Sequence, residues 1–291
     1  MSQTKTLAEL TIKNNFLFSA VMLDPENCRG LLEIILGISI DRVIVSREQC
    51  LIYHPEYRSV RLDIYARDSR NTHYNVEMQV SPKPALAKRC RYYHSQMDME
   101  LLLAGTDYTG LPDTYVIFIC DFDPFGKDQY RYTFRTTCQE SENVDLEDGR
   151  TTVFLNTRGK NESEVPGELV TFLQYMKEDL EGSEKEFHDP YVEQLQKFIR
   201  NVKGSREMEE RFMMIEELMQ EEFEAGRAEG KTEGERNSLT TAVLDILEIR
   251  NIKTDAVETL VKETDSAEIL RNMYRFAVNC TNAEEFLKNF Q

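Results

Sequence analysis

Two runs of alternating apolar and polar residues lie between residues 59 and 80. Apolar side chains occupy every second position of each run, first Val60, Leu62 and Ile64, then Tyr74, Val76, Met78 and Val80. A period of two is typical of β-strands. The polar residues 68–71 between the runs have the composition of a turn. The pattern therefore predicts a β-hairpin.

The hairpin predicts a pair of facing acids. If Arg67 pairs with His73, the numbers of paired residues sum to 140, and Asp63 lies opposite Glu77. Directly opposite side chains share a face, with Cβ atoms about 4.5–5.5 Å apart. Gln79, two residues further on, shares that face. Like charges that close repel each other, so the pair needs a cation or a shared proton.

Two interpretations of these acids are open. Two carboxylates with room for water suit Mg²⁺, which prefers oxygen ligands and often binds one or two carboxylates together with substrate phosphates. The alternative is a solvated hairpin face on which both acids are simply exposed, which is common.

The rest of the pattern predicts an α/β fold with a central mixed sheet flanked by helices. Two helices are expected within residues 8–37, the second beginning near Pro25 and ending at Gly37. A long helix is expected from Pro84 to Ala104. Further strands are expected at residues 40–47, 115–122, 130–136 and 151–155, and none after Pro166.

The C-terminal part has a different character. Between residues 205 and 236, apolar residues recur every three or four positions on a highly charged segment, at Met208, Phe212, Ile215, Met219 and Phe223. This stripe suits a partner helix and a homodimer, or packing onto the chain's own N-terminal part. Glycines at 226, 230 and 234 favour a weak helix or a connector. Residues 237–291 are expected to form a small helical bundle, with helix starts at Asp265-x-x-Glu268 and Thr281-x-x-Glu284.

Several segments resemble one nuclease family. Arg61-Leu62-Asp63-Ile64, followed by Val76-Glu77-Met78-Gln79, resembles the core motif of the PD-(D/E)XK nuclease superfamily, and in particular its recombination-promoting, transposase-like branch. The flanking segments 13–18, 89–93 and 105–108 also resemble that branch, in the same order. The resemblance covers roughly residues 8–235, and it is the order and spacing of the segments that make it specific.

The resemblance implies a restriction-endonuclease-like core in residues 1–165, with a helical extension at 166–204. Asp63 and Glu77 would be metal ligands for Mg²⁺, although Mn²⁺ or Ca²⁺ could occupy such a site. Gln79 stands where the wider superfamily usually has Lys, a residue that positions the attacking water. Glu33, a lone charge in an apolar helical run, is the candidate for an additional catalytic acid, with a solvent-facing boundary Glu as the equal alternative.

The distribution of charge qualifies the net charge of −17. Residues 1–140 hold 16 basic and 18 acidic residues, a net charge of −2, whereas the remaining 19 and 34 give −15. A nearly neutral N-terminal part can still present a basic face to DNA. Basic residues cluster around the expected site, and the DNA-binding candidates are Arg61, Lys83, Lys88, Arg89 and Arg91.

Composition narrows the other possibilities. No run of about 18 apolar residues is present, so a membrane span is not expected. Six cysteines without Cys-x-x-Cys spacing are typical of reduced thiols, and we expect a cytoplasmic protein. The acidic C-terminal bundle is a candidate for binding a protein partner.

Two functional hypotheses follow. The first is a metal-dependent DNA endonuclease, linked through the resemblance to recombination, mobile elements or phage defence. The second is a catalytically weak or inactive protein that binds DNA or assembles with partners while retaining the nuclease fold.

Overall fold

The computed structural model describes residues 5–51, 60–141 and 144–290. The chain divides into two compact units, Met1–Phe212 and Met213–Gln291. The first unit contains the sheet, and the second is helical. The boundary between the units falls within one long helix, α6 (Arg206–Ile249).

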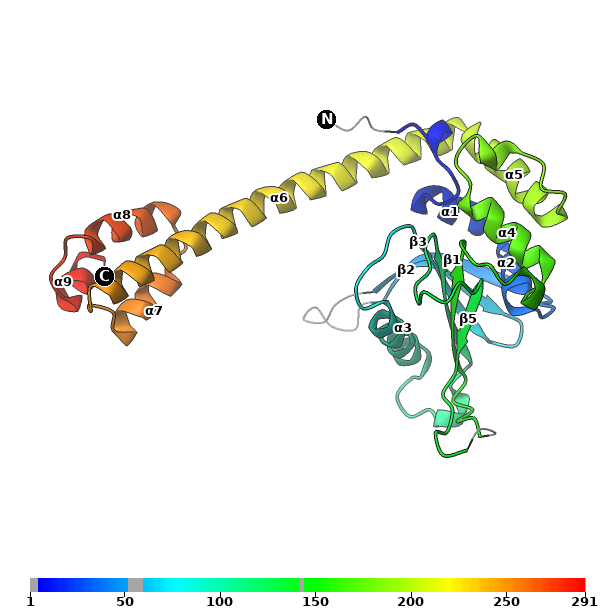
Figure 1. Cartoon of the computed structure of the whole chain (residues 1–291), viewed down its shortest axis with the longest axis horizontal. Helices are drawn as coiled ribbons and strands as arrows, with labels where there is room; N and C mark the ends of the chain where they lie inside the picture. The colour runs from blue at the N-terminus through cyan, green and yellow to red at the C-terminus, as the bar shows by residue number, and fades with distance from the viewer. Residues whose placement is uncertain (1–4, 52–59, 142–143, 291) are drawn as a thin grey trace. The chain divides into compact units, whose positions relative to one another are not determined.

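The N-terminal unit is built on one six-stranded mixed sheet (Figure 1). Its strands are β1 (Val43–Leu51), β2 (Val60–Asp68), β3 (His73–Gln79), β4 (Thr114–Cys120), β5 (Arg131–Phe134) and β6 (Arg150–Asn156). The spatial order is β1-β2-β3-β4-β6-β5. β3, β4 and β6 run parallel in the centre, and the remaining neighbours pair antiparallel. The predicted mixed sheet is thereby confirmed.

The predicted hairpin register is correct. Arg67 pairs with His73 and Ile64 with Val76, so the paired numbers sum to 140. β3 also pairs in parallel with β4, which makes it an interior strand, and all seven of its residues are buried. A hairpin face that looked half-solvated from its sequence therefore lies inside the molecule.

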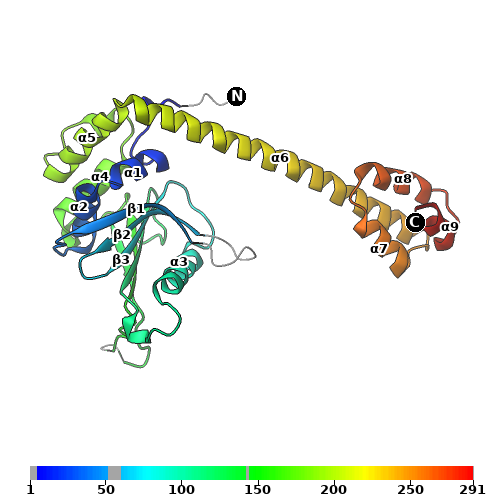
Figure 2. The same cartoon turned by 180° about the vertical axis from the view of Figure 1, so that it is seen from behind.

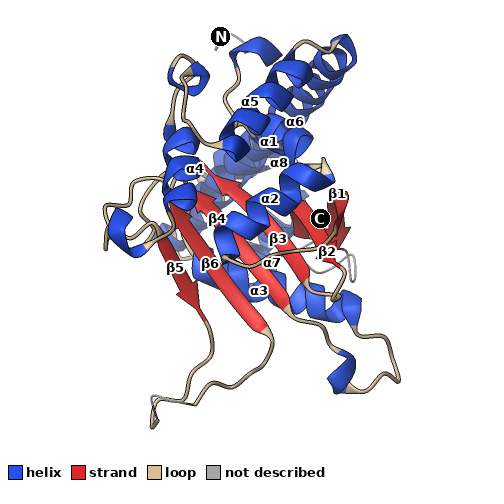
Figure 3. Ribbon diagram, turned by 90° about the vertical axis from the view of Figure 1, so that its right-hand side faces the viewer, coloured by secondary structure: helices blue, strands red, loops and turns tan. Residues whose placement is uncertain are grey.

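Helices cover both faces of this sheet (Figures 2 and 3). On one face lie α1 (Asn15–Met22), α2 (Pro25–Leu36), α4 (Gly167–Lys177) and α5 (Pro190–Lys203), and on the other lies α3 (Leu86–Leu101). Short 3₁₀ helices occur at Leu7–Glu9, Tyr108–Gly110, Glu162–Glu164 and Gly182–Glu184. The described residues up to Phe212 thus form three layers, with the sheet between helices on each of its faces.

Local chemistry fixes the ends of α2 where the sequence predicts them. Asp24 accepts backbone hydrogen bonds from Glu26 and Asn27, and Pro25 occupies the first helical position, where its missing N–H costs nothing. Gly37 ends the helix with φ of 67°, a left-handed conformation that other residues adopt at a cost. By contrast, α3 begins at Leu86 rather than Pro84, because Ala85 has φ of 64° and cannot belong to the helix.

The two faces of the sheet carry separate apolar cores. Alternate residues of β3 and β4, such as Val76 and Ile117, join the larger core beneath α1, α2, α4 and α5. The smaller core beneath α3 contains Tyr93, Phe118 and Phe154. The side chains of Asn75, Glu77 and Gln79 alternate with Val76 and Met78, so they face α3 and the smaller core.

The apolar stripe from Met208 to Phe223 is buried at its start and exposed at its end. In α6 (Arg206–Ile249), Phe212 is buried in the larger core, with its ring 5.2 Å from that of Phe16, and Met208 packs beside it. Met219 and Phe223 are 60% and 70% exposed. The first part of the stripe therefore packs onto the chain's own core, and the second part is left exposed.

The glycine repeat lies inside α6 instead of forming a connector. A Cβ atom added at Gly226, Gly230 or Gly234 would meet nothing within 4 Å. Packing therefore does not require glycine at these positions, and each costs the helix about 1 kcal/mol relative to alanine.

The C-terminal unit is a helical bundle, as the sequence predicts. The end of α6 packs with α7 (Asp255–Glu263), α8 (Ala267–Ala277) and α9 (Ala283–Phe290) around a core that includes Leu247, Met273 and Phe286. The predicted helix starts are each one residue too early. Ser266 accepts from the Ile269 N–H, and Asn282 accepts from the Glu285 N–H, because these side chains reach the exposed amides of the first turn.

Candidate active site

Glu77 lies at the centre of the candidate site. It is near the end of β3, and its side chain is only 1% exposed. Its Oε1 accepts a hydrogen bond from the Asp63 backbone N–H at 3.3 Å and another from Asn75 Nδ2 at 3.2 Å. Burial of an ionised carboxylate is costly unless it is paired, so these donors alone do not account for Glu77.

Arg89 of α3 supplies the missing cation. Its Nη2 donates to Glu77 Oε2 at 2.5 Å, and its Nη1 donates to Gln79 Oε1 at 3.2 Å. Its Nε donates to the Tyr93 hydroxyl at 2.7 Å. The guanidinium carbon lies 5.1 Å from the centre of the Tyr93 ring and 5.2 Å from that of Phe118, within range of cation–π attraction. Arg89 is thus fixed by charge, hydrogen bonds and aromatic packing together.

Asp63 lies beside Glu77 on β2, just beyond the last regular pair of the hairpin, Ile64 with Val76. Its side chain is half-buried, less so than that of Glu77. The backbone contact from Asp63 to Glu77 Oε1 brings the two acids together, as the register predicts. The hypothesis that both acids are simply exposed is wrong for Glu77.

Burial is the main reason why the pKa of Glu77 rises from its ordinary value of 4.5 to about 7. The Asp63 carboxylate raises the pKa further by repulsion, while Arg89 and the hydrogen-bond donors oppose the rise. The carboxyl is therefore poised between its protonated and ionised forms near neutral pH. A divalent cation between two acids would favour the ionised form.

Gln79 is buried, and both ends of its amide make a hydrogen bond. Nε2 donates to the carbonyl of Met78 at 2.9 Å, while Oε1 accepts from Arg89. The positive charge absent from Gln79 itself is thus present one hydrogen bond away. Asp63, Glu77 and Gln79 are brought together on one face as the sequence predicts.

Asn75 was not among the sequence candidates. It is fully buried on the same face of β3, donates to Glu77, and leaves its own Oδ1 without a hydrogen-bond partner among the described residues. An orphaned buried acceptor is costly and often marks a functional position. Its place two residues before Glu77, on the same strand face, is the feature of the sequence that could have identified it.

Glu33 lies elsewhere. Its carboxylate accepts from Arg29 Nη1 at 2.9 Å and from the Ile40 N–H at 2.8 Å, which ties α2 to the segment before β1. α2 packs on the sheet face opposite α3, so the structure does not bring Glu33 to Asp63 and Glu77. The geometry gives no support to a catalytic role for Glu33.

The basic candidates differ in their surroundings. Lys83, Lys88 and Arg91 are exposed, as contacts to a phosphate backbone require. Arg89 is held inside the site by Glu77, so it is not a freely exposed DNA contact. The side chain of Arg61 lies outside the described residues.

Comparison with known protein families identifies the family to which this chain belongs. The model of the PD-(D/E)XK nuclease family transposases matches residues 13–226, which include the whole sheet and both acids. This chain belongs to that family. No curated protein and no solved structure matches the chain significantly.

Membership confirms the resemblance inferred from the sequence, and the mixed sheet flanked by helices is consistent with the PD-(D/E)XK fold. The family implies a nuclease or transposase role, action on phosphodiester bonds and binding to DNA, and its members typically use divalent metals. Among the described residues, no helix combines the length and apolar character needed to cross a membrane.

The raised pKa of Glu77 predicts how stability depends on pH. A carboxyl with a higher pKa when folded stabilises the protein fully below its unfolded pKa, and this contribution is lost as pH rises through about 7. Glu77→Gln should therefore gain stability relative to wild type between about pH 5 and about pH 8 without divalent metal. Arg89→Gln should lose stability over the same range, because it removes the cation that balances ionised Glu77.

Urea unfolding at a series of pH values, in a chelator, measures both differences, and titrations shared by all three proteins cancel. The double variant Glu77→Gln/Arg89→Gln serves as the control and should lack the pH-dependent loss. Equal pH dependence in all the variants would show that Glu77 titrates normally.

Proposed function

We propose that this chain is a metal-dependent DNA endonuclease that hydrolyses phosphodiester bonds, with Asp63 and Glu77 as metal ligands. The observation that carries the proposal is a carboxylate buried in a central strand beside a second acid, within a family of nucleases. Nothing about the packing of the sheet requires an acid at residue 77, and an apolar residue would be less costly there. A role in binding metal would explain why a costly buried carboxylate is kept at residue 77.

The residues present fit a hard divalent cation such as Mg²⁺. Asp63 and Glu77 offer only carboxylate oxygens, and Mg²⁺ is commonly held by one or two carboxylates together with waters and substrate phosphates. Among the described residues there is no cluster of three or more acidic, His or Cys ligands, so water and phosphate must complete the shell. The bound ion would polarise a phosphoryl oxygen and lower the pKa of a bound water.

The chain's own residues then have separate tasks. Glu77 must release the Arg89 guanidinium from Oε2, or share it, in order to offer that oxygen as a ligand. Arg89, once released, carries its positive charge to the place where the scissile phosphate would lie. Gln79 holds the guanidinium through Oε1 and can orient water through its amide. Asn75 keeps Glu77 in position through Oε1.

The second candidate is a protein that retains the fold for binding DNA or assembling with partners but cleaves weakly or not at all. The Arg89–Glu77 ion pair favours it, because the guanidinium occupies an oxygen that a metal would need. The Glu77 end of this pair is buried, so the carboxylate would be left with a costly unpaired charge unless a metal replaced the guanidinium. Cleavage of plasmid DNA with and without Mg²⁺ distinguishes the two candidates.

Loss of either acid should abolish cleavage. We expect Asp63→Asn and Glu77→Gln to remain folded, because each removes one of two repelling charges while keeping the side chain's size. Supercoiled plasmid incubated with Mg²⁺ should be nicked by wild type and left intact by both variants, with thermal melts as the folding control. Glu33→Gln is a matched acid substitution on the opposite face and should cleave normally. Wild-type cleavage by Asp63→Asn or Glu77→Gln would remove the site assignment.

Gln79 should affect rate more than metal affinity. Stabilisation of developing charge in a preorganised site often contributes a few kcal/mol, so Gln79→Ala should lower the single-turnover rate by roughly a hundredfold. Metal binding should change little, since Asp63 and Glu77 hold the ion. Gln79→Lys restores the common superfamily residue and should retain substantial activity. A wild-type rate for Gln79→Ala would withdraw the catalytic role.

We also propose a homodimer formed through the exposed part of the α6 stripe. Met219 and Phe223 are exposed apolar residues on a charged helix, whereas Phe212 is buried in the chain's own core. Met219→Glu/Phe223→Glu should yield a monomer by light scattering and leave the thermal stability of the N-terminal unit unchanged. Glu217→Gln/Glu221→Gln, two changes on the same helix, should remain dimeric. A dimer that persists in the Met219/Phe223 variant would place the contact elsewhere.

A further inference from the structure

A cavity lies on the same sheet face as Glu77, between α3 and the outer strands β5 and β6. It encloses about 340 Å³. Its lining includes Arg91 and His94 of α3, Phe125 of the loop after β4, and Phe134, Arg135 and Phe154 on the β5–β6 side. This volume lies at the lower end of the range for small-molecule sites, roughly 300–1,000 Å³, so it suits one ring system and not a duplex.

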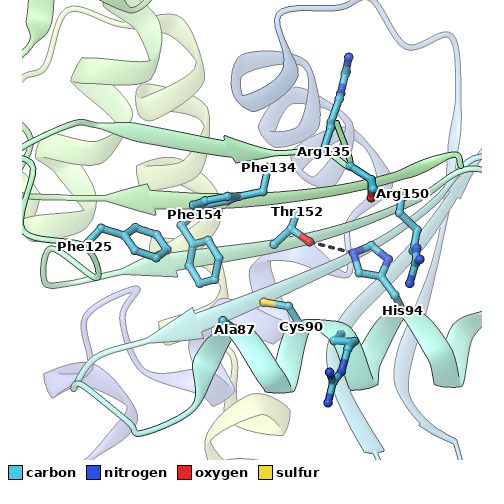
Figure 4. Close-up of a pocket in the computed structure, with 11 residues that line it drawn as sticks. Ala87, Cys90, His94, Phe125, Phe134, Arg135, Arg150, Thr152 and Phe154 are labelled. Carbon is cyan, nitrogen blue, oxygen red and sulfur yellow. Dashed lines mark hydrogen bonds between the residues drawn. The ribbon is translucent and has the colours of Figure 1, made fainter. Parts of the chain in front are cut away.

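Three phenylalanines form one end of the cavity (Figure 4). The Phe125 and Phe134 rings lie 5.1 Å apart, and each meets the buried Phe154 ring edge-on, at 5.1 and 5.9 Å. Phe125 and Phe134 nevertheless remain 39% and 46% exposed. Exposed aromatic rings that are held in place by a buried third ring are suited to stacking against a planar ligand.

The other end of the cavity is polar and contains a neutral histidine. His94 is buried, and its ring nitrogens bond Thr114 Oγ1 at 2.8 Å and Thr152 Oγ1 at 3.0 Å. Burial lowers the pKa of His94 to about 4, so the ring is neutral at physiological pH. Both ring nitrogens of His94 are already engaged, so the group here that can hydrogen-bond the polar edge of a heterocycle is the Thr152 hydroxyl, which His94 holds in place.

Three arginines, Arg91, Arg135 and Arg150, also line the cavity. Arg150 is paired with Asp148 at 3.3 Å. Within the described part of the chain, no carboxylate lies within 4.0 Å of the Arg91 or Arg135 guanidinium. Unbalanced cations are notable in a chain with a net charge of −17, and they favour a ligand that carries negative charge.

The cavity shares its aromatic layer with the candidate active site. Phe154 stacks on Phe118 at 5.4 Å, and Phe118 stacks on Tyr93 at 6.2 Å. Arg89, which holds Glu77, lies over both Tyr93 and Phe118. The cavity and the candidate active site are therefore joined by one packed layer of rings beneath α3.

We propose that this cavity holds one unstacked base of a DNA strand, with Arg91 and Arg135 contacting the neighbouring phosphates. The assignment rests on the proposed nuclease function and deepens it, because a base can enter only from single-stranded or locally unpaired DNA. Flat apolar walls, a polar end with the Thr152 hydroxyl, and guanidiniums that no carboxylate of the described residues pairs match a nucleobase with its phosphates. The substrate class is thus DNA with unpaired bases.

Binding of short fluorescent oligonucleotides to the full chain in a chelator tests the proposal without cleavage. Wild type should bind an oligothymidylate strand more tightly than a duplex of equal length. Loss of one stacking contact costs about 1–3 kcal/mol, so Phe134→Ala should weaken strand binding by about 5- to 150-fold and leave duplex binding unchanged. Phe134→Tyr, which keeps the ring, should bind as wild type does, and Arg135→Gln should reduce the salt dependence.

Tyr108→Ala removes an aromatic ring that is 83% exposed and outside the cavity, so it is the matched control and should change nothing. Equal effects of Phe134→Ala and Tyr108→Ala, or equal losses on strand and duplex, would overturn the proposal. So would thymidine 5′-phosphate alone binding as tightly as the strand, since the cavity would then be a nucleotide site. Intact strand binding without any cleavage in Mg²⁺ would refute the nuclease function alone.

Discussion

Burial of the Glu77 carboxylate inside the central strand β3 is the constraint on which the architecture of this site depends. The sheet places the residue between two neighbouring strands, and its side chain is only 1% exposed, so its charge needs partners from the protein. The structure answers with Arg89, which reaches across from α3, and with donors from Asn75 and the Asp63 backbone. The position of α3 on the sheet is therefore coupled to the charge of Glu77. The same coupling sets the electrostatics of the site. The pKa of Glu77 is raised, and the Arg89 guanidinium is held beside Gln79.

Arg89 also changes how the departure of Gln79 from the common superfamily lysine is interpreted. On the strand alone, a neutral amide at residue 79 removes the positive charge that would face a phosphate. The structure places the Arg89 guanidinium 3.2 Å from Gln79 Oε1, so the charge is supplied from the helix instead. Arg keeps its charge under all relevant conditions and has several donors in a fixed geometry. Under the proposed function, an exchange of this kind would account for Gln79 in an active centre.

The sequence predicts those parts of the site that depend on local geometry. The turn at residues 68–71 fixes the register of the hairpin, and with it the convergence of Asp63, Glu77 and Gln79 on one face. The role of Arg89 depends on how α3 packs across the sheet, which no period or spacing encodes. Its place in a basic cluster indicated a DNA contact, whereas its partner is Glu77. The prediction for Glu33 has no structural support for a related reason: the sequence does not reveal which face of the sheet α2 covers.

The central claim is that Asp63 and Glu77 together bind the divalent cation that the reaction requires. Binding of Mn²⁺ to the purified full chain above about pH 7, measured from the electron paramagnetic resonance signal of the free ion, tests it without any substrate. The account predicts saturable binding by wild type that weakens as pH falls below about 7 and is lost in Glu77→Gln, with Glu33→Gln unaffected. Equal Mn²⁺ binding by wild type and Glu77→Gln would contradict it.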